Sequence, residues 1–234
     1  MWQNNEEPKS LDGKLNIGDR PVAGEDIFGM LTELNEQCLA LLAEQALRPV
    51  PPPPPMYREL VDLWGRLDAA SQRRAAACPY VLMDAGFCDP YRWQWLSDQQ
   101  ANARSGIQDT LRAPAVFGKF FTAPTLTQVA RQLFTTAWHI AQSQPISAPL
   151  FLGMPAQCVA LLRTCSMRQL TDLADQHAGW LRPRWPGRQK VWRNLLEAGI
   201  SADEEELQMA RLHGVQLLAM ELKAMERLKL GAAR

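Results

Sequence analysis

One phrase occurs twice in this chain, and it constrains the fold more than any other feature. Residues 85–93 read AGFCDPYRW and residues 178–185 read AGWLRPRW, so both run Ala-Gly-aromatic, then Pro, then Arg-Trp. The similarity extends upstream, where Leu31 and Leu126 each begin an apolar pattern that a proline-rich break follows. This extended match indicates an internal duplication. Chance similarity between two helical stretches rich in Leu, Ala and Arg is the alternative.

Apolar residues in both copies recur at helical spacing. Leu31, Leu34, Cys38 and Leu42 fall on one stripe of a predicted helix. The prolines at 51–55 cannot continue that helix, because proline lacks an amide donor and its ring clashes with the preceding turn. They favour a polyproline II spacer between helices, with a ligand for a proline-reading protein module as the alternative.

We therefore predict an all-α fold with two degenerate copies of one helical unit, which form a pseudo-dimer within a single chain. The predicted parts are a disordered tail (1–24), unit A (25–98) with a polyproline spacer (49–55), a linker (99–120), unit B (121–197) and a C-terminal helix (200–231). The two units should superpose as helices in the same order, without strands. Phe87 should then be equivalent to Trp180, and Trp93 to Trp185.

Helix boundaries are marked by residues that suit them. Short polar side chains accept the free amides of a first helical turn, and the candidates are Asp68 or Ser71, Ser166 and Ser201. Gly86 and Gly179 stand where their helices should end in a left-handed conformation.

The bulk composition is that of an ordinary globular protein. The chain is 47% hydrophobic, and its 25 basic and 25 acidic residues cancel, so no global field attracts nucleic acid or membrane. It has neither an apolar run long enough for a membrane span nor a secretory leader, which favours the cytoplasm. The 5 cysteines form no Cys-x-x-Cys pair, so we expect buried thiols and no metal site.

The motifs of catalysis are not evident. The 3 histidines are isolated, and His139 lies in an apolar helical pattern that favours a packed core or edge position. The sequence has no phosphate-binding glycine loop and no nucleophile elbow. We therefore expect a non-catalytic protein without a cofactor, although an enzyme with an unrecognised site is an alternative.

A short basic segment, residues 182–193, is the clearest candidate for a binding site. It contains five cations and no acid, and its candidate nucleic-acid-binding residues are Arg182, Arg184, Arg188, Lys190 and Arg193. Three tryptophans are interleaved as candidates for base stacking or for the core: Trp180, Trp185 and Trp192. Guanidinium groups pair with phosphates and indoles stack on bases. The alternative is a solvated basic loop whose tryptophans are buried.

The C-terminal helix carries a regular apolar seam, formed by Val215, Leu218, Leu222 and Met225. Such a seam either closes over the two units or pairs with a second molecule. Because the duplication already supplies an internal partner surface, we expect a monomer rather than a homodimer. Leu218→Asp and Leu222→Asp are each expected to destabilise the fold.

Residues 150–222 partly resemble a known family. The matching positions in the stretch LFLGMPAQCVALLRTCSMRQLTDLADQHAGWLRPRW are Leu152-Gly153, 166–170, Leu173-Ala174 and Arg184-Trp185, and the later stretch ARLHGVQLLAMEL is loosely similar. They resemble the flagellar master-regulator D subunit family. The resemblance implies an all-α, dimeric protein that binds promoter DNA with a separate zinc-containing partner subunit. This chain is about twice as long and duplicated, so no DNA-contacting residue is transferred from the family.

Two hypotheses of function follow. The first is a non-catalytic transcriptional regulator that binds DNA, or a DNA-bound second regulator subunit, through unit B. The second is a protein–protein adaptor or a secretion or assembly scaffold, which the neutral charge, the polyproline spacer and the C-terminal seam favour.

Overall fold

The computed structural model describes residues 23–47, 55–87, 89, 93, 121 and 125–232, and these are mostly helical. The predictions of a disordered tail, a polyproline spacer and a linker fall mainly outside the described residues, as does Cys88. No helix in the described part of the chain is long and apolar enough to cross a membrane.

The described residues of the first half include four helices and a short strand. They are α1 (Ala23–Leu47), α2 (Pro55–Arg58), α3 (Val61–Arg66), α4 (Ala69–Ala76) and β1 (Met83–Asp84). The predicted stripe of α1 is buried. Asp68 is the N-cap of α4, because its Oδ1 accepts the Ser71 amide at 2.7 Å. Asn35 of α1 then fixes the route from α4 to β1: its Oδ1 accepts the Leu82 amide, and its Nδ2 donates to the Tyr80 carbonyl.

The second half begins with a long helix and ends with a longer one. The elements are α6 (Leu126–Ser143), α7 (Ala148–Leu152), α8 (Ala156–Thr164), α9 (Met167–His177), the 3₁₀ turn η1 (Ala178–Trp180), β2 (Arg182–Pro183), α10 (Gln189–Ser201) and α11 (Glu204–Ala232). Ser166 caps α9 as predicted, in a reciprocal capping box with Gln169.

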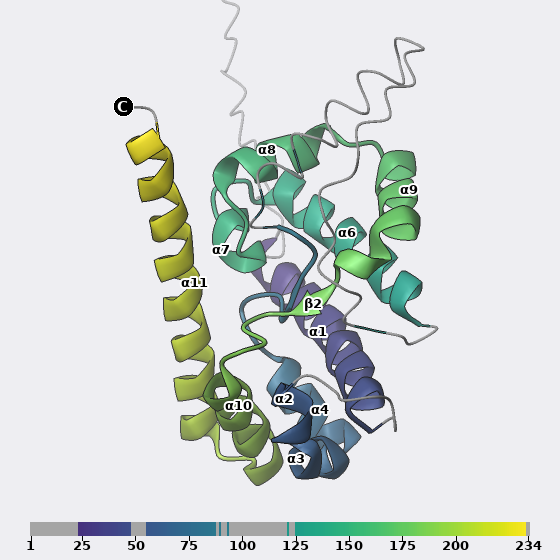
Figure 1. Ribbon diagram of the computed structural model, residues 1–234, viewed down its shortest axis with the longest axis vertical. Coiled ribbons are helices and arrows are strands. Elements are labelled where there is room, and N and C mark those ends of the chain that lie inside the picture. The colour runs from purple at the N-terminus through teal and green to yellow at the C-terminus, as the bar shows by residue number, and fades with distance from the viewer. Residues whose placement is uncertain are drawn as a thin grey trace, which may run out of the picture.

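The helices pack around one continuous core (Figure 1). The long helix α1 packs against α3 and α4, and the long helix α6 packs against α8 and α9. The two long helices also pack against each other, so both halves contribute to the same core. Helices α10 and α11 pair along one side of this body, and α11 continues beside α7.

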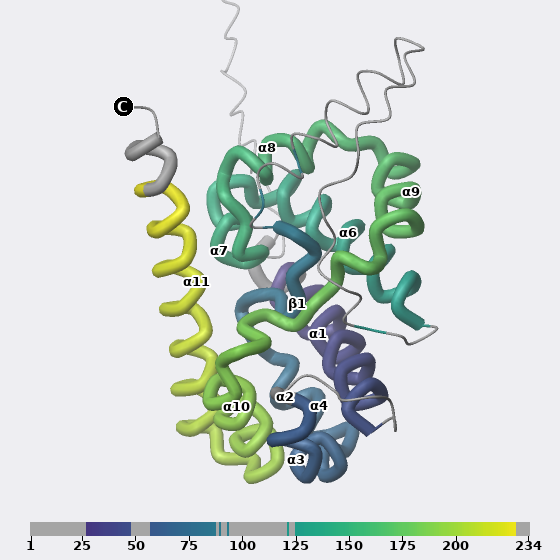
Figure 2. The backbone as a smooth tube through the Cα atoms, in the orientation of Figure 1, coloured from purple at the N-terminus to yellow at the C-terminus, as the bar shows by residue number. Residues whose placement is uncertain are grey.

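A two-stranded antiparallel sheet joins the halves, which the sequence did not predict. Strands β1 and β2 pair with Met83 opposite Pro183 and Asp84 opposite Arg182. Figure 2 shows the two segments side by side at the centre of the molecule. The expectation of units without strands is therefore wrong, because each half contributes one strand.

The repeated phrase does not occupy equivalent positions. Trp180 ends η1 before β2, whereas Phe87 lies in a turn after β1. Trp93 has helical backbone, whereas Trp185 has φ 50° in a turn. Both predicted equivalences are wrong. Gly86 has the expected left-handed backbone (φ 77°), but it follows a strand, and Gly179 lies inside η1.

The start of the C-terminal helix also differs from the prediction. Ser201 is the last residue of α10, not an N-cap, and α11 begins at Glu204. Asp203 takes the capping role, since its Oδ1 accepts the Glu206 amide at 3.0 Å. The acidic residues Glu204, Glu205 and Glu206 lie in the first turn of α11, where they complement the helix dipole.

Candidate functional site

Arg184 is the most deeply buried cation of the basic segment, with 4% of its surface exposed. Its Nε donates to the Val81 carbonyl at 2.7 Å, and its Nη2 donates to the Leu152 carbonyl. Its main-chain amide donates to the Leu82 carbonyl at 3.0 Å. The prediction that Arg184 binds nucleic acid is wrong, because its guanidinium is enclosed by backbone from the segment before β1 and from the end of α7.

Arg182 is held in an ion pair across the sheet. Its Nε and Nη2 lie 3.0 and 2.9 Å from Asp84 Oδ2, and Asp84 is itself buried. Asp84 Oδ1 accepts the Phe87 amide, so both oxygens of the carboxylate are used. Charge-assisted pairs of this kind fix geometry. Arg182 therefore serves to hold β2 on β1.

Arg188, Lys190 and Arg193 are exposed. They lie at the start of α10, and Arg193 Nη1 is 3.5 Å from Glu197 Oε1. Arg193 Nη2 also donates to the Glu59 carbonyl at 3.3 Å. The predicted cationic site is thus reduced from five residues to three.

The three tryptophans Trp180, Trp185 and Trp192 are buried in the core. This confirms the core alternative for them and contradicts base stacking. Trp180 stacks on His177 with ring centroids 4.1 Å apart. Trp185 Nε1 donates to Glu221 Oε1 at 2.8 Å, and Trp192 Nε1 donates to the Arg184 carbonyl at 2.8 Å. The indoles therefore link η1 to α9, the turn after β2 to α11, and α10 to the Arg184 carbonyl.

The predicted seam of α11 faces the body of the molecule. Leu218 is fully buried, whereas Val215, Leu222 and Met225 are half-buried. Leu207 and Leu217, which the seam did not include, are also buried. Helix α11 therefore closes over its own chain most tightly in its first half.

A groove of about 670 Å³, lined by both polar and apolar residues, lies between α11 and the turn after β2. It is lined by Arg182, Arg188 and Trp185 on one side and by Glu221, Ala224 and Met225 on the other. Arg182 and Trp185 already use Asp84 and Glu221, so this groove offers few free polar groups.

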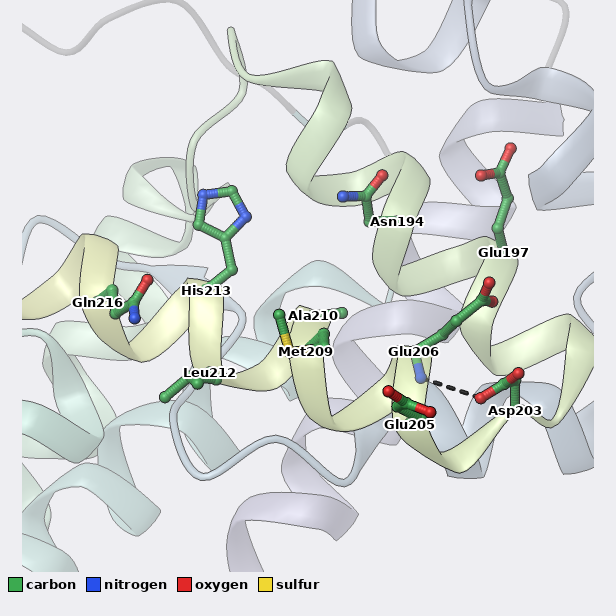
Figure 3. A pocket seen from close by; sticks show the side chains of 10 residues that line it. All are labelled: Asn194, Glu197, Asp203, Glu205, Glu206, Met209, Ala210, Leu212, His213 and Gln216. Atoms are coloured by element: carbon green, nitrogen blue, oxygen red, sulfur yellow. Dashed lines mark hydrogen bonds between the residues drawn. The ribbon is translucent and has the colours of Figure 1, made fainter.

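A groove of about 730 Å³ lies between α10 and the first half of α11 (Figure 3). It is lined by Asn194, Glu197, Asp203, Glu205, Glu206, Met209, Ala210, Leu212, His213 and Gln216. Four of these residues are acids and none is Lys or Arg, so one end of the groove is strongly negative. Met209 and Leu212 add apolar surface beside the acids.

The same side chains begin a longer stripe, which we call the outer face of α11. Its members are all exposed: Glu205, Met209, Leu212, Gln216, Met220, Lys223 and Arg227. The apolar members are exposed by 63% (Met209), 51% (Leu212) and 59% (Met220). The outer face therefore has an acidic end, an apolar centre and a basic end. The sequence pattern did not reveal this face because the more regular seam lies on another side of the helix.

The described residues do not assemble an evident catalytic centre. They contain no group of three or more His, Cys, Asp or Glu that could hold a metal ion. Burial raises the pKa of the Cys78 thiol to about 12 and raises the pKa of the Cys38 thiol further, which suppresses the nucleophilic thiolate. His139 and His213 are exposed on different helices.

Comparison of the chain with protein-family models, curated proteins and solved structures finds no match. The resemblance to the flagellar master-regulator D subunit family therefore stays a prediction.

Proposed function

We propose that this chain is a non-catalytic helical adaptor that binds another protein through the outer face of α11. The observation that carries the proposal is the exposure of Met209, Leu212 and Met220 along one side of a helix whose opposite side is anchored in the core. Exposed apolar side chains that cluster in this way mark interaction surfaces, whereas single ones do not.

The magnitude of the apolar effect supports binding. Burying one large apolar side chain contributes roughly 1.5–3 kcal/mol, so three half-exposed ones supply a useful part of a micromolar affinity. The charges at the two ends of the outer face add orientation more than affinity, because exposed ion pairs are individually weak.

Photo-crosslinking in cells tests this proposal. A photoreactive amino acid replaces Leu212, and in a control it replaces Thr171, which is exposed on α9. We expect a discrete crosslinked protein species from position 212 that position 171 does not give. If both positions give the same adducts or none, the outer face is not a docking surface.

DNA binding through unit B is the second candidate. It rests on the exposed cations Arg188 and Lys190 at the start of α10, whose first turn has no acid. Contact could involve DNA alone or DNA with a second regulator subunit. A gel shift with random duplex at low salt is expected to weaken steeply as salt rises and on R188E/K190E substitution. The absence of a shift at low salt, alone or with candidate regulators, excludes this function.

We also infer that the chain is an internally duplicated pseudo-dimer, at a register other than that of the repeated phrase. Each long helix packs on two later helices of its own half. Met83 and Arg182 begin the strands, Gly86 and Trp185 have positive φ, and Trp93 and Trp192 follow. In each of these three pairs, the two residues are the same number of positions apart along the chain. Each tryptophan also donates its indole N–H to the turn that follows the strand of its own half: Trp93 to the Gly86 carbonyl and Trp192 to the Arg184 carbonyl.

A further inference from the structure

The stripe on the outer face of α11 is self-complementary. From Glu205 to Arg227, successive members lie three or four positions apart, which keeps them on one side of the helix. The order of these spacings is the same read forwards or backwards from Gln216. A helix with this pattern matches itself when it is turned end over end.

We propose that a second copy of this chain occupies the outer face, with the two α11 helices antiparallel about a two-fold axis at Gln216. This inference rests on the adaptor function proposed above and names its partner. It replaces the monomer expected from the sequence, because the face involved is not the seam on which that expectation was based. In this arrangement Leu212 of each copy meets Met220 of the other, and Met209 lies along the aliphatic stem of Lys223. Glu205 of each copy meets Arg227.

Charge selects the antiparallel arrangement. A parallel pair would place Glu205 against Glu205 and Arg227 against Arg227, and like charges across a helix pair oppose association. The antiparallel pair brings opposite charges together at both ends. The same complementarity makes α11 of a second copy fit the acidic groove of Figure 3, because that groove contains Glu205 and Glu206 and no cation.

The fold leaves this face free for a partner. Leu207, Leu217 and Leu218 anchor the opposite side of α11 in the core, so docking requires no rearrangement of the monomer. Helix α11 also lies at the edge of the molecule in Figure 1, so a second body can approach from its outer side. The stripe spans about 33 Å at the rise of an α-helix. One helix pair is smaller than a standard interface, so we expect micromolar affinity.

Sedimentation velocity of the purified full chain tests the proposal, over low to high micromolar concentrations. The wild type should pass from monomer to dimer, and Leu212→Asp should remain monomeric. Glu205→Arg and Arg227→Glu should each weaken dimerisation several-fold, and the double variant E205R/R227E should restore it. Asp172→Arg on the exposed side of α9 is the control and should dimerise like the wild type. Circular dichroism confirms that each variant is folded.

Restoration in the double variant separates a direct contact from a folding defect. A wild type that stays monomeric at all concentrations overturns the proposal, and so does a dimer that Leu212→Asp and the single charge reversals leave intact. A monomeric wild type that still crosslinks to a different protein at position 212 overturns the self-association alone. If the wild type is monomeric and position 212 gives no crosslinked species, the adaptor function is overturned as well.

Discussion

At the scale of single residues, Arg184 is predicted from the sequence to bind a ligand, whereas in the structure it stabilises the fold. Its guanidinium joins the segment before β1 to the end of α7, and its carbonyl accepts the Trp192 indole. A buried charge persists only when its donors are satisfied, and here backbone carbonyls satisfy them.

Replacing Arg184 with Ala should therefore destabilise the protein by about 2–5 kcal/mol, because two buried carbonyls lose their donor and a cavity remains. Replacing the exposed Arg188 with Ala should change stability by less than about 0.5 kcal/mol. Urea denaturation of both variants measures these differences. Equal stability of the two variants would mean that Arg184 is not a structural residue.

The burial of Arg184 could not be predicted from the sequence. Its partners Val81 and Leu152 lie far from it along the chain, and no local pattern joins them. The same holds for Asp84, which neutralises Arg182 across the sheet. The sequence left two alternatives for the interleaved tryptophans, base stacking and burial in the core. Tertiary packing buries them in the core.

At the scale of elements, the helices were predictable wherever apolar periodicity or a cap marked them. The stripe of α1 and the Ser166 cap of α9 follow from sequence pattern alone. The strands were not predictable, because two residues are too few to show alternation. Ser201 suits an N-cap by residue type, but α10 continues through it and Asp203 caps α11 instead.

Two helical glycines should respond to alanine in opposite directions. A Cβ on Gly29 of α1 would meet nothing within 4 Å, so Gly29→Ala should stabilise the protein by up to about 1 kcal/mol through helix propensity. A Cβ on Gly214 of α11 would overlap the Tyr80 hydroxyl. Overpacking costs about 1–3 kcal/mol, which exceeds the propensity gain, so Gly214→Ala should destabilise. Thermal unfolding checks both signs, and a stabilising Gly214→Ala would contradict the packing of α11 on Tyr80.

The seam of α11 should be unequal along its length. Leu218 is 1% exposed and Leu222 is half-buried. Leu218→Asp should therefore cost about 3 kcal/mol or more, and Leu222→Asp should cost clearly less. This revises the expectation of similar effects at the two positions. Denaturant titration decides, and equal losses would place Leu222 in the core.

At the scale of the whole molecule, one body is built from two interlocked halves. The helix pair α1–α6 and the strand pair β1–β2 both join the halves, and the described buried residues of the two halves form one core cluster. Helix α11 is anchored on this body by one side only. The side that faces outward carries the exposed apolar residues, and it is there that we expect a partner.

Methionine oxidation of the purified chain tests this arrangement most directly, because sulfoxide formation follows exposure. Met83 and Met154 are fully buried, Met209 and Met220 lie on the outer face, and Met167 is 46% exposed on α9 as an internal control. In dilute protein, peroxide should oxidise Met209, Met220 and Met167 before the buried pair. At high concentration Met209 and Met220 should become protected while Met167 does not. Rapid oxidation of Met83 and Met154 in the native protein would contradict the common core, and equal reactivity of Met209, Met220 and Met167 at every concentration would contradict docking on α11.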